Sequence, residues 1–150
     1  MSLSEIFDQK SIIPSLAGKT KLDVFKELIE RIAAANPELD KDTMFTAIQD
    51  REQKLNTSIA PGVAVPHGYY PGIDGIFGAL GISQSGIEYE SLDSKPVHCV
   101  LLLIMGESAR EKHLRVLNRI AFLINSGGTE LLLKAKGKAA INEILSHIQF

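Results

Sequence analysis

The chain has 150 residues, 45% hydrophobic and 23% charged, a composition typical of a folded domain and not of a disordered segment. A net charge of −2 and a pI near 6.1 give no electrostatic case for binding nucleic acid or an anionic membrane. No apolar run is long enough for membrane insertion, and the first ten residues lack a signal-peptide pattern. The sequence therefore predicts one cytoplasmic domain over residues 1–150.

Two helices are expected in the first third. Residues 20–35 carry apolar side chains at helical spacing, and Asn36-Pro37 ends that pattern. Asp40 is a suitable N-cap for a second helix, whose last turn, residues 50–52, should be exposed. Its inward-facing residues would be Met44, Phe45 and Ile48.

Three apolar segments predict strands, at 63–65, at 75–82 and at 97–105, with a turn at 83–86 after the second. The third is apolar except for His98, as expected of a central strand covered on both faces. It contains Cys99, the single cysteine, which excludes an internal disulfide and should be a buried, inert thiol.

The last third predicts helices at 109–125, 129–135 and 139–148, the first ended by Gly127-Gly128. The apolar stripe of the first would be Leu114, Leu117, Ile120, Ala121 and Ile124; that of the last would be Ile141, Ile144, Leu145 and Ile148. Helices, then strands, then helices indicate a three-layer α/β/α sandwich with a mixed central sheet of about five strands.

The motif Pro66-His67-Gly68 directly follows the expected strand at 63–65. Pro66 lacks an amide hydrogen, so the strand ladder should stop there and leave His67 at a strand end. Gly68 would let the chain turn away without crowding the imidazole. A histidine held in this way is a candidate nucleophile or ligand, but a turn histidine after a buried strand fits the spacing equally well.

Other polar residues each allow two interpretations. Arg51 could bind a phosphate group or be a solvated arginine at a helix end. His113 could donate a hydrogen bond to a bound anion or lie on the surface beside Glu111. Thr57 could hold Arg51 or His67 through its hydroxyl, or stabilise a turn.

The remaining histidines are less promising. His98 is expected to be a core histidine with satisfied hydrogen bonds, and His147 to face solvent. The usual short spacings of metal ligands are absent, as is a glycine fingerprint for nucleotide binding. No metal and no cofactor are therefore expected.

The spacing from residue 51 to residue 67 resembles the type 2 enzyme IIA domains of the bacterial phosphoenolpyruvate-dependent phosphotransferase system (PTS), which include fructose, mannitol and nitrogen-regulatory IIA proteins. The residues that match are Arg51-Glu52, Thr57, Ile59, Gly62, Ala64, Pro66 and His67, followed by Pro96-Val97 and His113-Leu114. Ser58 and Ala60 depart from the family, which usually has glycine at both positions, so this loop should be stiffer.

The resemblance implies that His67 is the phosphorylated nucleophile, through Nε2, and that Arg51 and His113 assist it. It also implies that Thr57, Gly62 and Gly68 surround or support the phosphoryl group. The second ring nitrogen of His67 should donate to a backbone carbonyl or a carboxylate, which would fix the tautomer.

Two functions follow from this resemblance. The first is a phosphocarrier, a phosphotransferase component that takes its phosphoryl group from the carrier protein HPr and passes it to an enzyme IIB domain in sugar uptake. The second is a regulatory protein of the nitrogen type, which binds target proteins in one phosphorylation state. Partners should dock around His67, with Tyr69, Tyr70 and Pro71 on the rim. Which sugar is served cannot be deduced from these residues.

Overall fold

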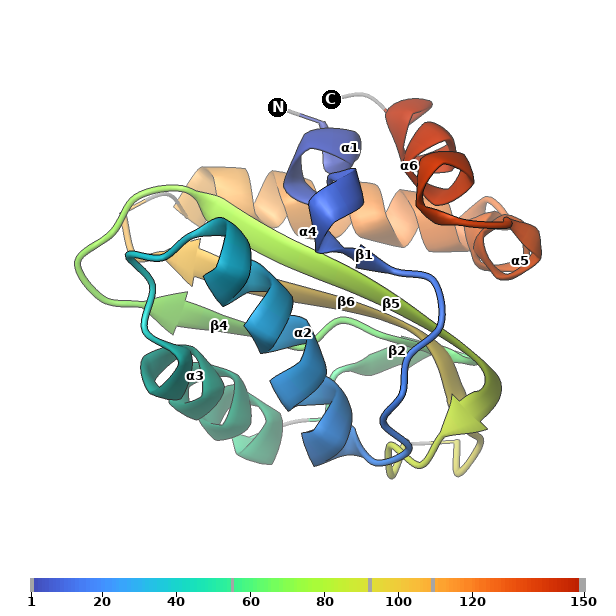
Figure 1. The fold of residues 1–150 in the computed structure, drawn as a ribbon, viewed down its shortest axis with the longest axis horizontal. Helices are drawn as coiled ribbons and strands as arrows, with labels where there is room; N and C mark the ends of the chain where they lie inside the picture. Colours follow the sequence, from blue (N-terminus) through green and yellow to red (C-terminus); the bar gives the residue numbers. More distant parts are fainter. Residues whose placement is uncertain (1, 55, 92, 109, 149–150) are drawn as a thin grey trace.

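A mixed sheet separates two layers of helices in the computed structural model, which describes residues 2–54, 56–91, 93–108 and 110–148 (Figure 1). The strand order is β1-β5-β6-β3-β2, and β4 also pairs with β6. The strands are β1 (Ile12–Ile13), β2 (Ser58–Ala60), β3 (Val63–Ala64), β4 (His67–Tyr70), β5 (Ile76–Ile87) and β6 (Val97–Gly106). The predicted α/β sandwich with a mixed sheet is confirmed.

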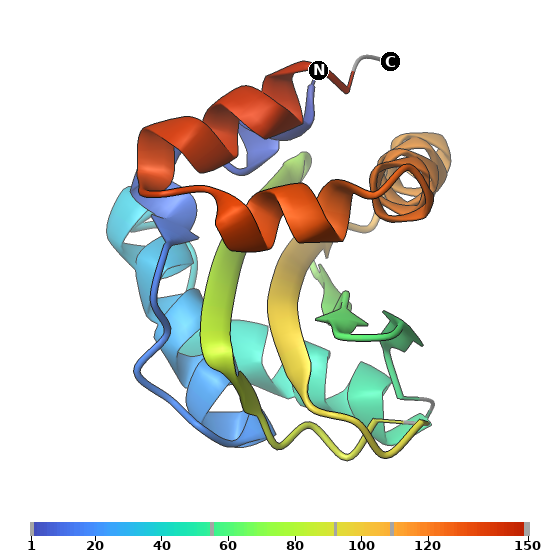
Figure 2. The ribbon, with the colours of Figure 1, turned by 90° about the vertical axis from the view of Figure 1, so that its right-hand side faces the viewer.

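The two layers of helices lie on opposite faces of the sheet (Figure 2). The first layer comprises α1 (Leu3–Ile6), α4 (Arg110–Asn125), α5 (Gly128–Lys134) and α6 (Lys138–Ser146). The second comprises α2 (Lys21–Ala35) and α3 (Lys41–Lys54), and a short 3-10 helix, η1 (Gln9–Ser11), leads into β1. Among the described residues, none of the helices has the length and apolar character that a bilayer crossing requires.

The central strand β6 is buried along its whole length except at His98, which is half-buried. Because side chains alternate along a strand, the odd-numbered residues from Cys99 to Met105 face the α4 layer and the even-numbered residues from Val100 to Ile104 face α2 and α3; Val97, at the start of the strand, packs on the α2 and α3 side. Burial raises the pKa of the Cys99 thiol to about 12, so this cysteine is inert, as predicted. His98 contacts the Ser83 carbonyl through Nδ1 at 2.9 Å, as expected of a satisfied histidine, and His147 is exposed.

The predicted apolar stripe of α4 is correct in part. Ile120 is buried and Leu117 and Ile124 pack against the core, but Leu114 is 62% exposed, and His113, Val116 and Leu123 are buried although the prediction omitted them. The buried face is shifted toward His113 and Val116 because the side chains there fill the space over β6, which the helix sequence alone does not describe. Residue 109, the predicted start of this helix, lies outside the described residues.

The turn predicted at residues 83–86 is instead part of β5. The pairing register of β5 with β6 shifts between Ile82 and Ile87, which marks a bulge, and Gly86 has a φ of +94°. A glycine at positive φ gives the strand this irregularity without ending it.

The Pro66 break interrupts a strand but does not end it. Val63 of β3 pairs in parallel with Cys99 of β6, and His67 of β4 pairs in parallel with Leu103. From one pair to the other, both chains advance by four residues, so the register with β6 is the same before and after Pro66. The prediction that the ladder stops at Pro66 holds locally, but His67 begins a new strand, so the prediction of a strand end and a turn after it was wrong.

Gly68 is the point where β4 lies closest to α3. A Cβ atom added there would lie 2.7 Å from the carbonyl carbon and oxygen of Ala47, which are backbone atoms that cannot rotate away. We therefore expect Gly68→Ala to lower the free energy of unfolding by about 1–3 kcal/mol through overpacking. Thr46→Ala, on an exposed position of the same helix, should stay within about 0.5 kcal/mol of wild type. Chemical denaturation of both variants is the measurement, and equal stability would contradict the close packing.

Candidate functional site

His67 lines a cavity of about 230 Å3 between the sheet and α4. Its other lining residues are Arg51, Asn56, Thr57, Ile59, Val65, Leu117 and Ile120. The structure thus brings together His67, Arg51 and Thr57, three of the predicted site residues. Two apolar residues of α4 form part of the wall, and Arg51 is the cationic side chain among the lining residues.

The tautomer of His67 is set by its own backbone. Nδ1 lies 2.9 Å from the carbonyl oxygen of Val65, two residues earlier. A carbonyl oxygen can only accept a hydrogen bond, so Nδ1 carries the proton, and in the neutral ring Nε2 keeps its lone pair. A backbone carbonyl was one of the two acceptors expected from the sequence.

Burial lowers the pKa of His67 below its usual value. The hydrogen bond to the Val65 carbonyl raises it, the positive charge of Arg51 lowers it, and the negative charge of Glu52 raises it. Burial dominates, so the ring is neutral at pH 7 and Nε2 is available as a nucleophile.

Arg51 lies in the last turn of α3 and is half-buried at the cavity wall. The interpretation as a fully solvated arginine is therefore excluded. A guanidinium at this place can pair with the oxygens of an anion held at Nε2 of His67.

His113 is buried in the first turns of α4, with 2% of its surface exposed, so the alternative of a surface histidine was wrong. Its ring centre lies 5.3 Å from that of Tyr69. Tyr69 is two residues from His67 on β4 and hence on the same face of the sheet. Leu117, one turn after His113, lines the His67 cavity. These contacts place the start of α4 near the His67 cavity.

Two of the predicted phosphate-supporting glycines have other places in the fold. Gly62 has a φ of +80° in the turn between β2 and β3, and its carbonyl accepts from the amides of His98 and Cys99. The next residue, Val63, pairs with Cys99, and His67 pairs with Leu103, four residues or about 13 Å farther along β6, so Gly62 is remote from the imidazole. Gly68 faces α3, on the opposite side of the strand from His67.

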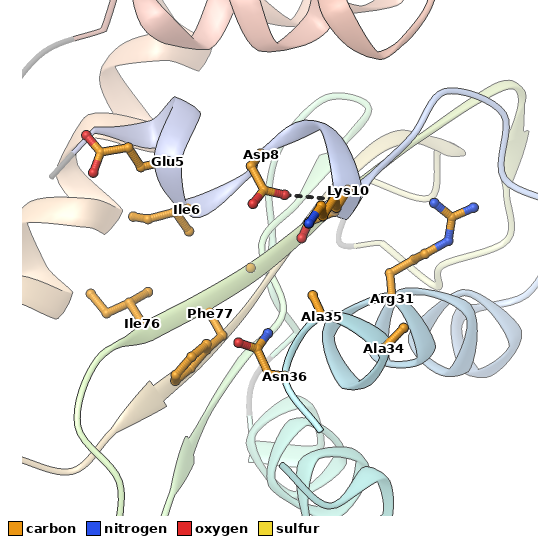
Figure 3. A pocket seen from close by; sticks show the side chains of 12 residues that line it. Glu5, Ile6, Asp8, Lys10, Arg31, Ala34, Ala35, Asn36, Ile76 and Phe77 are labelled. Atoms are coloured by element: carbon orange, nitrogen blue, oxygen red, sulfur yellow. Dashed lines mark hydrogen bonds between the residues drawn. The ribbon is translucent and has the colours of Figure 1, made fainter. Parts of the chain in front are cut away.

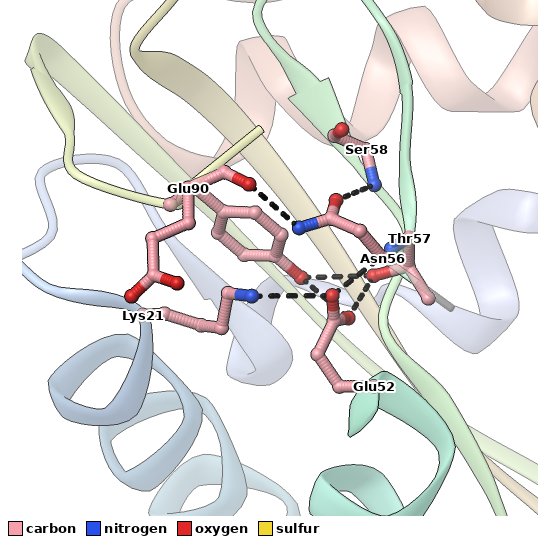
Figure 4. A network of polar contacts seen from close by, with 7 residues as sticks. Lys21, Glu52, Asn56, Thr57, Ser58 and Glu90 are labelled. Atoms are coloured by element: carbon pink, nitrogen blue, oxygen red, sulfur yellow. Dashed lines mark hydrogen bonds and ion pairs between the residues drawn. The ribbon is translucent and has the colours of Figure 1, made fainter. Parts of the chain in front are cut away.

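A buried carboxylate that the sequence did not single out adjoins the site. Glu52 was expected in an exposed helical turn but is 8% exposed. It accepts hydrogen bonds from the amide and the hydroxyl of Thr57, from the hydroxyl of Tyr89 and from Nζ of Lys21 (Figure 4). The Thr57 hydroxyl therefore binds Glu52. Burial, and secondarily the charge of Glu52, raise the pKa of Tyr89, which stays a neutral donor.

A larger hollow of about 410 Å3 lies between η1, the end of α2 and β5 (Figure 3). Lys10 and Arg31 line it together with Glu5 and Asp8, and Asp8 accepts from the Ser11 amide at 3.1 Å. None of the predicted site residues is among its described lining residues. Within the described part of the chain, no group of three potential metal ligands is found.

A family model described as the phosphoenolpyruvate-dependent sugar phosphotransferase system, EIIA 2, matches residues 5–148. The chain belongs to this family. Its members are phosphotransferase components of a phosphotransfer cascade, which agrees with the resemblance found in the sequence.

Relatives of both expected kinds are found. The nitrogen regulatory protein of Bradyrhizobium diazoefficiens is 31% identical over 147 residues, which cover 97% of this chain and 95% of that protein. The fructose-specific EIIABC component of Bacillus subtilis is 30% identical over 147 residues, but this chain spans 23% of its length. The crystal structure of the nitrogen regulatory protein IIA-Ntr from Neisseria meningitidis superposes with a TM-score of 0.88 at 25% identity, covering 95% of this chain and 98% of that one.

The lowered pKa of His67 can be tested directly. We expect an NMR titration of its ring to give a midpoint below 6.5, the ordinary value, because burial opposes the charged form. Arg51→Gln should raise the midpoint, since it removes a positive charge that disfavours protonation. A His67 midpoint above 6.5 would contradict the dominant effect of burial.

Proposed function

We propose that the protein is a phosphocarrier that holds a phosphoryl group on Nε2 of His67. The observation that supports this most is the hydrogen bond from Nδ1 to the Val65 carbonyl, which leaves the Nε2 lone pair free at a cavity wall shared with Arg51. The donor is an HPr-type phosphocarrier bearing a phosphohistidine, and the acceptor is an enzyme IIB domain in sugar uptake.

The transfer needs little beyond alignment and charge stabilisation. The Nε2 lone pair attacks the donor's phosphorus, a P–N bond forms to His67, and the P–N bond of the donor breaks. The donor ring, which carries a proton on its other nitrogen, takes back its electron pair and leaves as a neutral imidazole. The proton on Nδ1 of His67 stays in place throughout, so no proton has to move in this step. Arg51 would stabilise the charge on the phosphoryl oxygens, and His113 would donate a further hydrogen bond to them.

Exposed apolar side chains lie around this site and suit protein partners that must bring their own reactive group to His67. Ile59 is 54% exposed at the cavity, Tyr69 is 46% exposed on β4, and Leu114 is 62% exposed next to His113. Tyr70 is half-buried, with its hydroxyl accepting from the Asp40 amide, so Tyr69 is the ring that faces a partner. Such apolar and aromatic groups are typical of the centre of an interface.

A regulatory role of the nitrogen type is the second candidate. It is favoured by the match to nearly the whole length of a nitrogen regulatory protein and by the likeness to IIA-Ntr. Here the phosphate on His67, with a charge of about −1.5 to −2, would switch binding of a target protein.

Incubation with labelled phosphoenolpyruvate, enzyme I and HPr tests phosphorylation. Label should appear in the wild type and be lost in His67→Ala; label retained by that variant would show another acceptor.

Arg51→Ala should slow transfer about tenfold or more, because charge stabilisation of the phosphoryl group is removed. Lys54→Ala, an exposed cation in the same helix turn, is the matched control and should transfer at the wild-type rate. Adding an enzyme IIB domain or a candidate target to the labelled protein then distinguishes transport from regulation.

His113 is tested by two substitutions. His113→Gln keeps a hydrogen-bond donor and should retain partial transfer, whereas His113→Ala should lose more. Because the ring is buried beside Tyr69, thermal unfolding of both variants is measured alongside. Equal transfer rates in two folded variants would exclude the donor role.

A further inference from the structure

Thr57 and Val65 lie opposite one another, Thr57 just before β2 begins and Val65 just after β3 ends. The pairing of Ser58 with Ala64 places them so, and the Val65 amide donates to the Thr57 carbonyl at 3.0 Å. In a regular antiparallel ladder, two residues paired in this way exchange both hydrogen bonds. Here the other two groups are bound elsewhere. The Thr57 amide donates to Oε2 of Glu52 at 3.0 Å, and the Val65 carbonyl contacts Nδ1 of His67 at 2.9 Å.

We propose that Glu52 is a positioning residue for His67: by accepting the Thr57 amide, it prevents that amide from closing on the Val65 carbonyl and leaves this carbonyl to Nδ1 of His67. The inference rests on the proposed function of His67 as the phosphoryl acceptor. Glu52 acts through Thr57 and Val65 and has no contact with the phosphoryl group in this role.

Glu52 is well suited to hold one amide in one place. An ionised carboxylate is an acceptor with about four lone-pair sites. Four donors converge on it: the amide and hydroxyl of Thr57, the hydroxyl of Tyr89 at 3.1 Å and Nζ of Lys21 at 3.3 Å (Figure 4). The donors come from α2, from the segment before β2 and from the segment after β5, so the carboxylate is fixed from three parts of the fold.

Loss of this acceptor has a specific chemical consequence. The Thr57 amide would then be free to complete the ladder pair with the Val65 carbonyl and compete with Nδ1 for it. The imidazole could then adopt the tautomer with the proton on Nε2, which has no lone pair there to attack phosphorus. The fold would be retained in outline, while the fraction of reactive histidine would fall.

Two substitutions of Glu52 test separately whether its hydrogen-bond acceptor or its negative charge is required. Glu52→Met keeps the volume and removes the acceptor, whereas Glu52→Gln removes the charge and still offers an oxygen to the Thr57 amide. The 15N NMR spectrum of the His67 ring in the unphosphorylated protein, recorded above its pKa, shows which nitrogen carries the proton. We expect Nδ1–H in the wild type and in Glu52→Gln, and a mixture of tautomers in Glu52→Met. Phosphorylation by phospho-HPr should fall in Glu52→Met by the same factor as the fraction of the Nδ1–H tautomer and stay at the wild-type rate in Glu52→Gln.

Tyr89→Phe is the matched control, because it removes a donor to the same carboxylate and leaves the contact of Glu52 with Thr57 in place. It should keep the Nδ1–H tautomer even if it lowers thermal stability. If Glu52→Met fails to fold because Lys21 is left without its counter-charge, the double variant Lys21→Met/Glu52→Met removes both charges and is compared with Lys21→Met.

A pure Nδ1–H tautomer in folded Glu52→Met, or in the folded double variant, would overturn the proposal. So would an equal loss of that tautomer in Tyr89→Phe, which would indicate a general loosening of the cluster. The ring spectrum requires no partner protein and therefore tests the role of Glu52 by itself. A wild-type protein that takes no phosphate from phospho-HPr would overturn the proposed function and leave this measurement standing.

Discussion

Burial of β6 on both faces is the constraint on which the rest of the structure depends. β6 pairs with β5 on one side and with β3 and β4 on the other, and both helical layers pack on its alternating side chains. The parallel pairing of His67 with Leu103 places the imidazole on the odd-numbered face of β6, under α4. The same strand leads into α4 and so positions His113. One strand therefore fixes the site from two directions.

The parts of the fold that depend on neighbouring residues were predictable from the sequence. Thr20 and Asp40 cap α2 and α3 through hydrogen bonds to residues three positions later. The shift of the buried face of α4 from Leu114 to Val116 was not predictable in this way, because both residues are apolar and either fits a stripe with Ile120. Contacts with β6 bury Val116 and leave Leu114 exposed. The strands β1 and β2, of two and three residues, are too short to show any periodicity.

The residues of the candidate site also fall into those that the sequence indicates and those that only the fold reveals. His67 and Arg51 were found because the spacing from residue 51 to residue 67 matches the family pattern; taken one at a time, each residue left two interpretations open. Glu52 was not, because a glutamate in the last turn of a helix normally faces solvent, and its burial comes from Lys21 and Tyr89 far away in the chain. The acceptor of Nδ1 is a main-chain carbonyl, which every residue possesses, so no sequence signal marks Val65.

The uninterrupted register of β3 and β4 has a consequence for the evolution of this segment. Adding or deleting one residue at Val65-Pro66 would exchange the faces of the following strand. The imidazole would then point at the backbone of α3, where even a Cβ atom does not fit beside Ala47. Gly68, which has no side chain, would take the place of His67 under α4. Single-residue insertions and deletions between residues 63 and 70 would therefore turn the reactive ring away from α4, even though the strand is broken there.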